Sequence, residues 1–229
     1  MMAGAFVSLG GTLSVLGAYG LPEFLSSVSI VKIVAGSLFP VGLILVVMLG
    51  AELFTGNNAM LIPGYIKKHY KISDVMLNWA LVYFGNFIGV LIFTVLFVWD
   101  CSLFSSPVYH SAIDSIVRAK VDQEWLMVFL KGIGANWCVC LALWLALSAD
   151  SLTGKVLGSW IPVMTFVVLG YEHSIANMFY FTSAQLEGTS ATIGECLWGN
   201  LFPATIGNII GGAVFVGCLH TWVHSADKK

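Results

Sequence analysis

Six long apolar stretches, separated by short polar segments, dominate this 229-residue chain. They lie at residues 2–20, 30–66, 76–99, 123–149, 156–187 and 195–223. A helix that crosses a membrane needs about 20 predominantly apolar residues. Only 10% of the residues are charged, whereas a soluble domain carries about a quarter. The sequence therefore predicts an all-α membrane protein with six transmembrane helices, forming a single transmembrane domain over residues 1–229.

The second and fifth stretches are too long for one straight helix across a hydrocarbon core about 30 Å thick. Each has a polar, glycine-containing segment near its middle, at residues 50–57 and 170–177. An acidic residue or a histidine facing lipid is costly. Irregular backbone is tolerated at membrane depth only where it is buried in protein or lines a cavity. We therefore expect both helices to be broken around a protected cavity.

The two halves of the chain share glycine and polar positions at a nearly constant offset. Gly50, Glu52 and Asn57 recur 120 residues later as Gly170, Glu172 and Asn177, and Asn78, Gly85, Asn86 and Gly89 recur 122 residues later as Asn200, Gly207, Asn208 and Gly211. This pattern predicts two three-helix repeats, over about residues 1–100 and 120–225, which must lie in opposite orientations. Inverted repeats place a substrate path at the bilayer midplane. The Gly-x-x-x-Gly pairs are expected to let helices approach closely.

Basic residues indicate the orientation of the helices. Those that follow even-numbered spans fall on one side of the membrane and are Lys67, Lys68, Lys71, Lys155, Lys228 and Lys229. Cytoplasmic loops carry an excess of Lys and Arg, so we expect both termini in the cytoplasm and the protein in the cell membrane. Arg118 and Lys120 fall on the opposite side and need another explanation. The net charge of −2 gives no reason to expect a nucleic-acid partner.

His173 is the most informative residue for function. It lies in the second polar segment beside Glu172, and a neutral imidazole both donates and accepts hydrogen bonds. Thr55, in the first polar segment, offers a hydroxyl to the histidine or to a passing solute. Each break also exposes the N-terminus of a half-helix, whose free N–H groups favour an anion. Glu52 and Glu172 would oppose an anion if they were ionised and faced the path, but we expect them to brace the breaks instead. The two breaks therefore predict a path for small anions.

Three polar residues outside the breaks have more specific expectations. Asn136 lies mid-span, where it either faces the path or forms a polar bond between helices. Lys131, about one helical turn earlier, is expected to extend outward to the membrane surface. Lys120 either draws anions into an outer vestibule or is a solvated loop lysine. The five cysteines read as small buried side chains rather than as a disulfide or metal site, and no cofactor is expected.

Four segments resemble the signature motifs of the formate/nitrite transporter family. They are Gly50–Thr55, Gly170–Met178, Ala135–Trp144 and Asn200–Gly212. The resemblance covers nearly the whole chain. It implies an aquaporin-like protomer, a homopentamer with one pore in each protomer, and transport of small monovalent anions such as formate, nitrite, hydrosulfide, acetate or lactate.

The same resemblance implies roles for particular residues. His173 matches the central histidine of the family, and Thr55 matches the loop threonine that faces it. Asn136 and Lys120 match a polar pore residue and a lysine. The residues that match the two apolar constrictions are Phe39, Leu43 and Phe166 for one, and Leu53 and Phe54 for the other.

Two apolar constrictions beside a histidine are a barrier to a bare anion, because desolvating a charge is very costly. We therefore predict proton-assisted transport, in which the anion accepts a proton at or near His173 and crosses as the neutral acid. One alternative is a passive, pH-gated anion channel with a charged histidine. Another is an intramembrane enzyme using Glu52, Glu172 and His173. The enzyme is disfavoured because the chain has no His-Glu-x-x-His run, and adjacent residues such as His173 and Ser174 diverge on a helix.

Overall fold

The computed structural model describes residues 1–226, and every regular element in that part of the chain is a helix. Six helices are long and apolar enough to cross a membrane: Met2–Tyr19, Val28–Met48, Ile72–Trp99, Trp125–Ser148, Leu152–Leu169 and Glu195–Val223. The prediction of an all-α protein with six membrane helices is therefore confirmed. Lys228 and Lys229, on which the predicted orientation partly rests, lie outside the described residues.

Several spans contain more than one element. The first half consists of α1 (Met2–Tyr19), the short 3-10 turn η1 (Glu23–Leu25), α2 (Val28–Leu38), α3 (Val41–Met48), α4 (Phe54–Met60), α5 (Ile62–Ile66), α6 (Ile72–Phe93) and the π-helical η2 (Thr94–Trp99). The second half consists of α7 (Pro107–Val121), α8 (Trp125–Ser148), α9 (Leu152–Leu169), α10 (Ser174–Glu187), the π-helical η3 (Glu195–Leu201), α11 (Phe202–Gly212), the π-helical η4 (Ala213–Cys218) and α12 (Leu219–Ala226).

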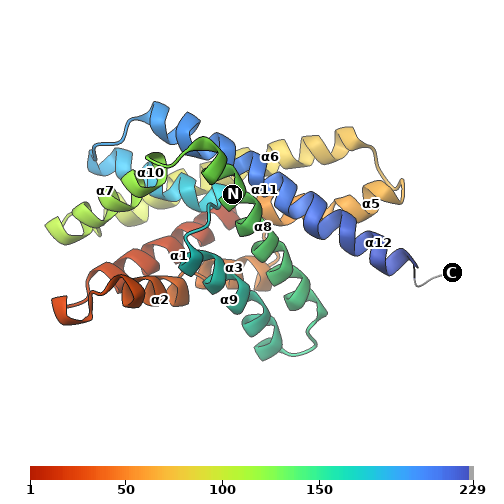
Figure 1. Ribbon diagram of the computed structural model, residues 1–229, viewed down its shortest axis with the longest axis horizontal. Helices are drawn as coiled ribbons and strands as arrows, with labels where there is room; N and C mark the ends of the chain where they lie inside the picture. The colour runs from red at the N-terminus through yellow and green to blue at the C-terminus, as the bar shows by residue number, and fades with distance from the viewer. Residues whose placement is uncertain (227–229) are drawn as a thin grey trace.

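The short helices α4 and α10 lie inside the bundle, where they touch elements of both halves. α10 packs against α1, α6 and α7, and α4 packs against α6, α8 and α11. In Figure 1, α12 projects beyond the bundle towards the C-terminus. The packing of α4 and α10 keeps their polar ends away from lipid, as irregular backbone at membrane depth requires.

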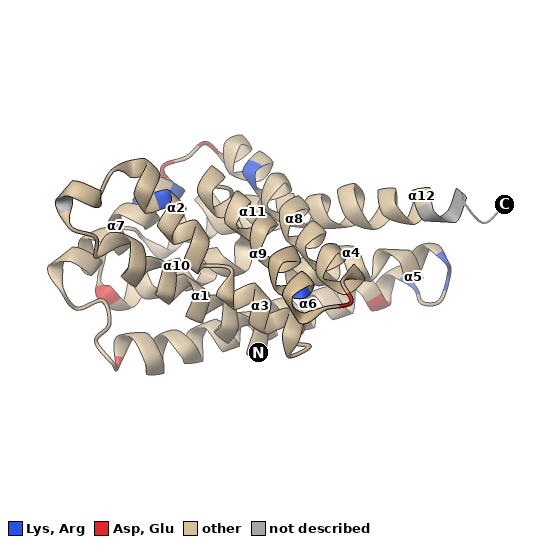
Figure 2. Ribbon diagram, turned by 90° about the horizontal axis from the view of Figure 1, so that it is seen from below, with Lys and Arg blue, Asp and Glu red and all other residues tan. Residues whose placement is uncertain are grey.

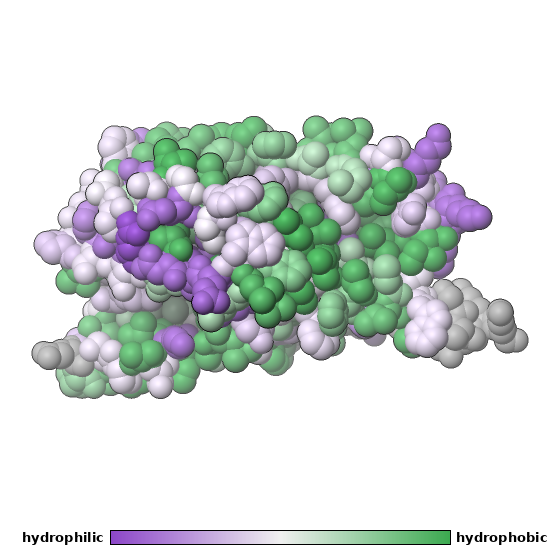
Figure 3. Space-filling view, turned by 45° about the horizontal axis from the view of Figure 1, so that its top comes forward, coloured by the Kyte–Doolittle hydropathy of each residue, from purple (hydrophilic) through white to green (hydrophobic). Residues whose placement is uncertain are grey.

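The outer surface of the helices carries few charges. Figure 2 shows Lys, Arg, Asp and Glu mainly on loops and near helix ends. In Figure 3, apolar residues cover the middle of the face in view, and hydrophilic residues gather towards its two ends. On α6, the apolar side chains of Leu77, Leu81 and Phe84 are exposed by 60%, 65% and 65%. Because transfer of such side chains out of water is favourable, this surface suits contact with lipid.

A glycine ends the helix before each break. Gly50 and Gly170 have φ angles of +66° and +69°, which residues with a side chain rarely adopt. The N–H of the residue after each glycine bonds back to a carbonyl five residues earlier, at 2.9 and 3.0 Å, as in a Schellman motif. Residues 49–53 and 170–173 are consequently non-helical, and α4 and α10 begin directly after them.

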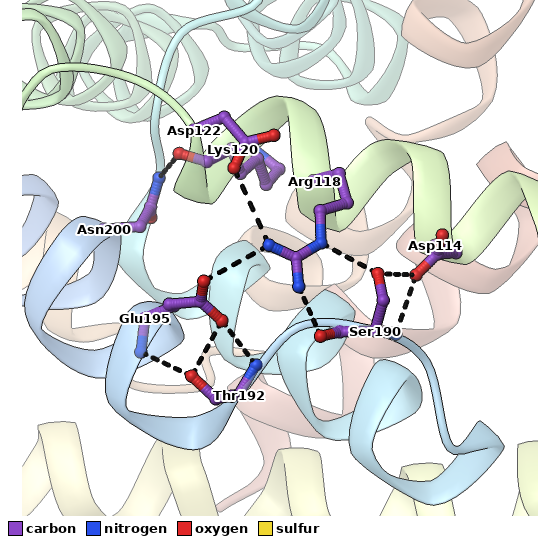
Figure 4. Close-up of polar contacts among 8 residues, drawn as sticks. All are labelled: Asp114, Arg118, Lys120, Asp122, Ser190, Thr192, Glu195 and Asn200. Carbon is purple, nitrogen blue, oxygen red and sulfur yellow. Dashed lines mark hydrogen bonds and ion pairs between the residues drawn. The ribbon is translucent and has the colours of Figure 1, made fainter.

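α7 lies outside the six membrane spans and is clamped to the connection between α10 and η3 (Figure 4). Arg118 Nε donates to Ser190 Oγ at 2.8 Å, its Nη2 donates to the Ser190 carbonyl, and its Nη1 lies 3.3 Å from Glu195 Oε1. The backbone N–H and hydroxyl of Ser190 donate to Asp114 Oδ1 at 2.9 and 2.7 Å, which holds the pKa of Asp114 below its ordinary value. These contacts give Arg118 a local structural role, which accounts for a basic residue at a place where the positive-inside rule does not expect one.

Candidate functional site

Two buried asparagines hold the backbone of the two breaks. Asn86 Oδ1 accepts from the first N–H of α4 at 2.9 Å, and its Nδ2 donates to the Glu52 carbonyl at 3.0 Å. In the second half, Asn208 Oδ1 accepts from the first N–H of α10 at 2.8 Å, and its Nδ2 donates to the Glu172 carbonyl at 2.9 Å. Buried backbone groups need hydrogen-bond partners, so these side chains replace the helical bonds that each break removes.

The two break carboxylates make matching contacts in different surroundings. Glu52 Oε2 accepts from Asn57 Nδ2 at 3.1 Å, and Glu172 Oε2 accepts from Asn177 Nδ2 at 2.8 Å. Each asparagine also donates to a second asparagine side chain, in α6 or η3, at 2.9 and 2.6 Å. Both glutamates thus brace their breaks, but Glu52 is exposed whereas Glu172 is buried.

Glu172 forms a buried ion pair with Lys120. Lys120 Nζ lies 2.9 Å from Glu172 Oε2, and Gln123 Nε2 donates to Glu172 Oε1 at 3.0 Å. The Lys120 ammonium also lies 5.5 Å from the centre of the Tyr180 ring. The charge of Lys120 is therefore compensated locally, and this residue is not a solvated loop lysine.

His173 is 3% exposed and is the N-cap of α10. Its Nδ1 accepts a hydrogen bond from the Ala176 N–H at 3.1 Å, and its Nε2 lies 2.9 Å from Thr55 Oγ1. A nitrogen that accepts from an N–H carries no proton itself, so the neutral ring has its proton on Nε2. Nε2–H then donates to the Thr55 hydroxyl, whose own proton remains free to donate to another group. His173 and Thr55, predicted as partners, lie in direct contact.

One aromatic ring stacks on the histidine, and a second lies against the first. The Phe166 ring stacks on the His173 ring at 5.7 Å with an interplanar angle of 20°, and Phe39 meets Phe166 edge-on at 5.9 Å. Leu43, one helical turn after Phe39, is buried as well. These apolar groups offer no hydrogen bond to a passing ion.

The residues expected at the other constriction lie at the start of α4. Leu53 and Phe54 are both 3% exposed. The Phe54 ring meets the Tyr83 ring edge-on at 4.8 Å, and the Tyr83 hydroxyl lies 3.0 Å from Thr205 Oγ1. Phe54 is thus fixed by α6 and, through Tyr83, by α11.

Asn136 uses its amide nitrogen to connect the two halves. Its Nδ2 lies 3.0 Å from the Thr55 carbonyl, 2.5 Å from the Asn208 carbonyl and 3.2 Å from Asn58 Oδ1. Of the two interpretations left open by the sequence, these contacts match a polar bond between helices. Asn136 therefore positions Thr55 through the backbone.

A cavity of about 310 Å³ opens beside the histidine. Its lining residues include Phe39, Phe166, Glu172 and His173, together with the three lysines Lys32, Lys120 and Lys131. Lys131, which we expected to extend outward to the membrane surface, instead points at Gln123, with 2.5 Å between Nζ and Oε1. The cavity thus joins the imidazole and its aromatic neighbours to a polar, lysine-rich mouth.

The glycines of the Gly-x-x-x-Gly pairs differ in how closely they are packed. A side chain at Gly207 would meet the Phe129 carbonyl and one at Gly211 the Ile133 carbonyl, both in α8. A side chain at Gly89 would meet the Met1 carbonyl. Gly85 has room, because the nearest atom to an added Cβ is the Met1 nitrogen at 3.4 Å. Close helix contact is thus made at three of these four positions.

Comparison with known proteins adds to this geometry. Residues 1–222 match the family model described as formate/nitrite transporter. The chain belongs to the formate/nitrite transporter family. The formate channel BtFdhC of Bacillus thuringiensis is 38% identical over 216 residues, covering 94% of this chain and 82% of that protein.

Two solved structures of similar proteins have the same fold. A protein described as an FNT family ion channel superposes with a TM-score of 0.89 at 32% identity, covering 97% of this chain and 87% of that one. A pentameric formate channel with formate bound gives a TM-score of 0.84 at 30% identity, covering 97% and 93%. The relatives are transporters and channels, so membership of this family confirms a multi-pass membrane transport protein and not an enzyme.

Two residues that line the cavity of this formate/nitrite transporter family member, Gln123 and Lys32, were not predicted from the sequence. Gln123 joins Lys131 to Glu172, and these two partners lie 8 and 49 residues away in the sequence. No local pattern links glutamine to either residue. Lys32 was missed for the same reason, since it reaches the cavity from α2.

Proposed function

We propose that the chain conducts small monovalent weak-acid anions, such as formate, nitrite or hydrosulfide, by a proton-assisted route. The anion enters the lysine-rich cavity, accepts a proton there, and passes the aromatic pair and His173 as the neutral acid. The observation that carries this proposal is the capping bond from Ala176 N–H to His173 Nδ1, at 3.1 Å.

That bond supports a specific role for the histidine toward a solute. A charged imidazolium carries protons on both nitrogens, so its Nδ1–H would face the Ala176 N–H and the cap would be lost. The buried ring is therefore a neutral donor through Nε2–H and the Thr55 hydroxyl. Such a site stabilises a neutral polar solute without supplying a counter-charge. The alternative of a passive channel with charged His173 has no support in this geometry.

The proton comes from the cavity rather than from His173. Donation by the ring would leave an imidazolate, because Nδ1 already lacks a proton. A proton taken up from bulk solution as hydronium reaches the anion through water in the cavity, so one proton crosses with each anion and the charge is lost before Phe39 and Phe166. A bare anion would lose hydration beside these rings without gaining a partner, at a cost of many kcal/mol.

The assembly, orientation and internal symmetry belong to the same proposal. We infer a homopentamer in the cell membrane with one path in each protomer and both termini in the cytoplasm. The pentameric formate channel, at 30% identity and a TM-score of 0.84, supports the assembly, and the basic residues after even-numbered spans support the orientation.

The two halves are inferred to be inverted repeats related by a two-fold axis. Tyr83 and Thr205 are 122 residues apart, the offset already seen for Asn86 and Asn208, and their hydroxyls lie 3.0 Å from each other. Contact between equivalent positions is what a two-fold axis produces where it passes. The matching bonds of Asn86 and Asn208 support the same relationship.

Uptake into proteoliposomes tests the proposed function. Purified protein should transport formate, nitrite and hydrosulfide faster than protein-free vesicles do, and His173→Ala should lower the flux, because it removes the Nε2–H donor and the cap of α10. Equal uptake by both kinds of vesicle for all three anions would refute the proposal.

A further inference from the structure

A second cavity, of about 180 Å³, lies between α4, α5, α8 and η4, and its lining includes Met60, Cys140 and Val216. This α4–α8 cavity shares no lining residue with the cavity beside His173. Among the described residues that line it, none has a charged, amide or hydroxyl side chain. An anion would therefore find no partner inside it, whereas an apolar group would fit its walls.

The α4–α8 cavity has a buried floor and an exposed, apolar rim. On the floor, Cys140 and Val216 are 2% and 1% exposed, and on the rim, Met60 and Leu147 are 50% and 62% exposed. Leu147 belongs to the membrane span Trp125–Ser148, so the cavity opens at the level of the membrane. An apolar cavity of about 150 Å³ is enough to take up a molecule such as benzene. The α4–α8 cavity therefore has room for part of a lipid acyl chain.

A basic turn follows α5, one of the helices that form this cavity. Its three lysines, Lys67, Lys68 and Lys71, lie between α5 and α6 and are exposed, and Figure 2 shows basic residues of this turn in blue beside α5. Lys67 lies four residues after Pro63, which lines the cavity, and four residues correspond to about 6 Å along a helix. Among the described side chains, no carboxylate forms an ion pair with these lysines. The basic turn thus places uncompensated positive charge close to the cavity.

Contacts within the basic turn hold it in a defined shape. The Tyr70 hydroxyl donates to the Leu61 carbonyl at 2.5 Å, and the Tyr70 ring lies against Gly64. At the end of the turn, the Lys71 N–H donates to Asp74 Oδ2 at 2.8 Å. Three lysines and this one carboxylate leave a surplus of two positive charges. The turn is therefore ordered before any ligand binds, which lowers the entropic cost of binding.

We propose that an anionic phospholipid binds here, with an acyl chain in the α4–α8 cavity and its phosphate at Lys67 and Lys68. The apolar cavity alone would suit any lipid, and the lysines alone would suit any phosphate. Their proximity selects a ligand with both parts, because anionic headgroups attract basic segments next to a membrane helix. The turn lies on the side that we infer to be cytoplasmic, where the leaflet is negatively charged. This inference goes beyond the proposed function and does not depend on which anion is carried.

The α4–α8 cavity also adjoins the helix that carries Thr55. On the floor of the cavity, Cys140 Sγ donates to the Thr55 carbonyl at 3.4 Å. In its wall, Leu143 occupies the space that a side chain at Gly56 would need. An acyl chain in the cavity would add dispersion contacts to these side chains. Lipid binding should therefore raise the melting temperature of the detergent-solubilised protein.

Native mass spectrometry of the intact oligomer tests the inference, because it counts bound lipids. The wild type should bind dioleoyl-phosphatidylglycerol, which is anionic, more tightly than dioleoyl-phosphatidylcholine, which has no net charge. Replacing both Lys67 and Lys68 with glutamine should weaken phosphatidylglycerol binding about fivefold for each lysine and leave phosphatidylcholine binding unchanged. Lys155→Gln is the control, because Lys155 belongs to α9, which supplies none of the described lining residues. It should change neither affinity.

A second pair of variants tests the cavity itself. Met60→Trp places a larger side chain on the rim and should weaken the binding of both lipids, because it obstructs the acyl chain. Met76→Trp is the matched control, since Met76 is 54% exposed but lies on α6, outside the cavity. It should bind both lipids as the wild type does. Glycerol phosphate, which has no acyl chain, should bind more weakly than phosphatidylglycerol.

The outcomes distinguish a lipid from other occupants. Equal affinity of the wild type for the two lipids overturns the inference, and this comparison needs no variant to fold. Unchanged phosphatidylglycerol binding without Lys67 and Lys68 overturns it as well. Glycerol phosphate that binds as tightly as phosphatidylglycerol would assign the lysines to a free phosphate instead. Loss of the oligomer in Met60→Trp, with lipid binding intact, would assign the cavity to a second copy of the chain. None of these measurements involves transport, so failure of the proposed function leaves this test unaffected.

Discussion

Replacing Thr55 with valine tests the contact at the centre of the path. Valine has nearly the shape of threonine but no hydroxyl, so Thr55→Val removes the oxygen that lies 2.9 Å from His173 Nε2. The Thr55 carbonyl keeps its bond from Asn136 Nδ2 at 3.0 Å. The substitution therefore leaves the backbone of the break supported and removes one side-chain bond.

The size of the effect follows from the burial of the pair. Thr55 is 0% exposed and His173 is 3% exposed, so water does not readily replace the missing partner. A typical intramolecular hydrogen bond contributes about 1 kcal/mol, and leaving a buried donor unpaired costs about 1–3 kcal/mol. If the hydroxyl also donates to the crossing solute, a loss of about 1.4 kcal/mol at the barrier lowers the flux about tenfold.

The assay is formate uptake into proteoliposomes at matched protein density. Thr94→Val is the control, because Thr94 is equally buried but its hydroxyl donates only to the Val90 carbonyl of its own helix, at 2.8 Å. We expect about tenfold lower uptake for Thr55→Val and nearly wild-type uptake for Thr94→Val. Full uptake by Thr55→Val would show that the hydroxyl does not take part in crossing.

Three further substitutions test other parts of the structure. Gly211→Leu should lower the yield of folded oligomer in size-exclusion chromatography, because overpacking costs about 1–3 kcal/mol. Gly85→Ala should not lower the yield, because there is room for a methyl group at Gly85. Equal yields of the two variants would contradict this. Phe166→Ala should raise chloride flux relative to formate flux, and an unchanged ratio would place Phe166 outside the barrier. Hydrogen bonds from Ser190 lower the pKa of Asp114 in the folded state. The ionised Asp114 therefore stabilises the fold fully above its unfolded-state pKa, near 3.8, and this stabilisation is lost as the pH falls through the lower folded-state pKa. Melting temperatures in detergent should therefore be lower for Asp114→Asn than for the wild type at pH 6 and converge towards pH 3, and parallel curves would contradict this.

The membrane helices could be predicted from the sequence because lipid imposes a simple requirement. A span must be apolar for about 20 residues, and the structure contains six such helices. The ends of α3 and α9 could be placed as well, because Gly50 and Gly170 adopt positive φ angles that few other residues tolerate. Both features depend on local composition and spacing.

The contacts inside the cavity could not be predicted in the same way. The direction in which Lys131 points depends on Gln123, and that of Gln123 depends on Glu172, 49 residues away. Asn136 is similar, because whether it faces the path or joins helices depends on the carbonyls of Thr55 and Asn208, 81 and 72 residues away. Only the packed fold brings these groups together.

The direct test of proton-assisted transport is to separate the proton gradient from the voltage. Formate uptake is measured in proteoliposomes with an inward proton gradient at zero potential, and again with a potential at equal pH, alongside the same two measurements for chloride. A neutral acid responds to the proton gradient and not to voltage, so we expect formate to accumulate in the first condition only and chloride in neither. Formate flux that follows the voltage at equal pH, or chloride flux equal to that of formate, would contradict passage of the neutral acid beside His173.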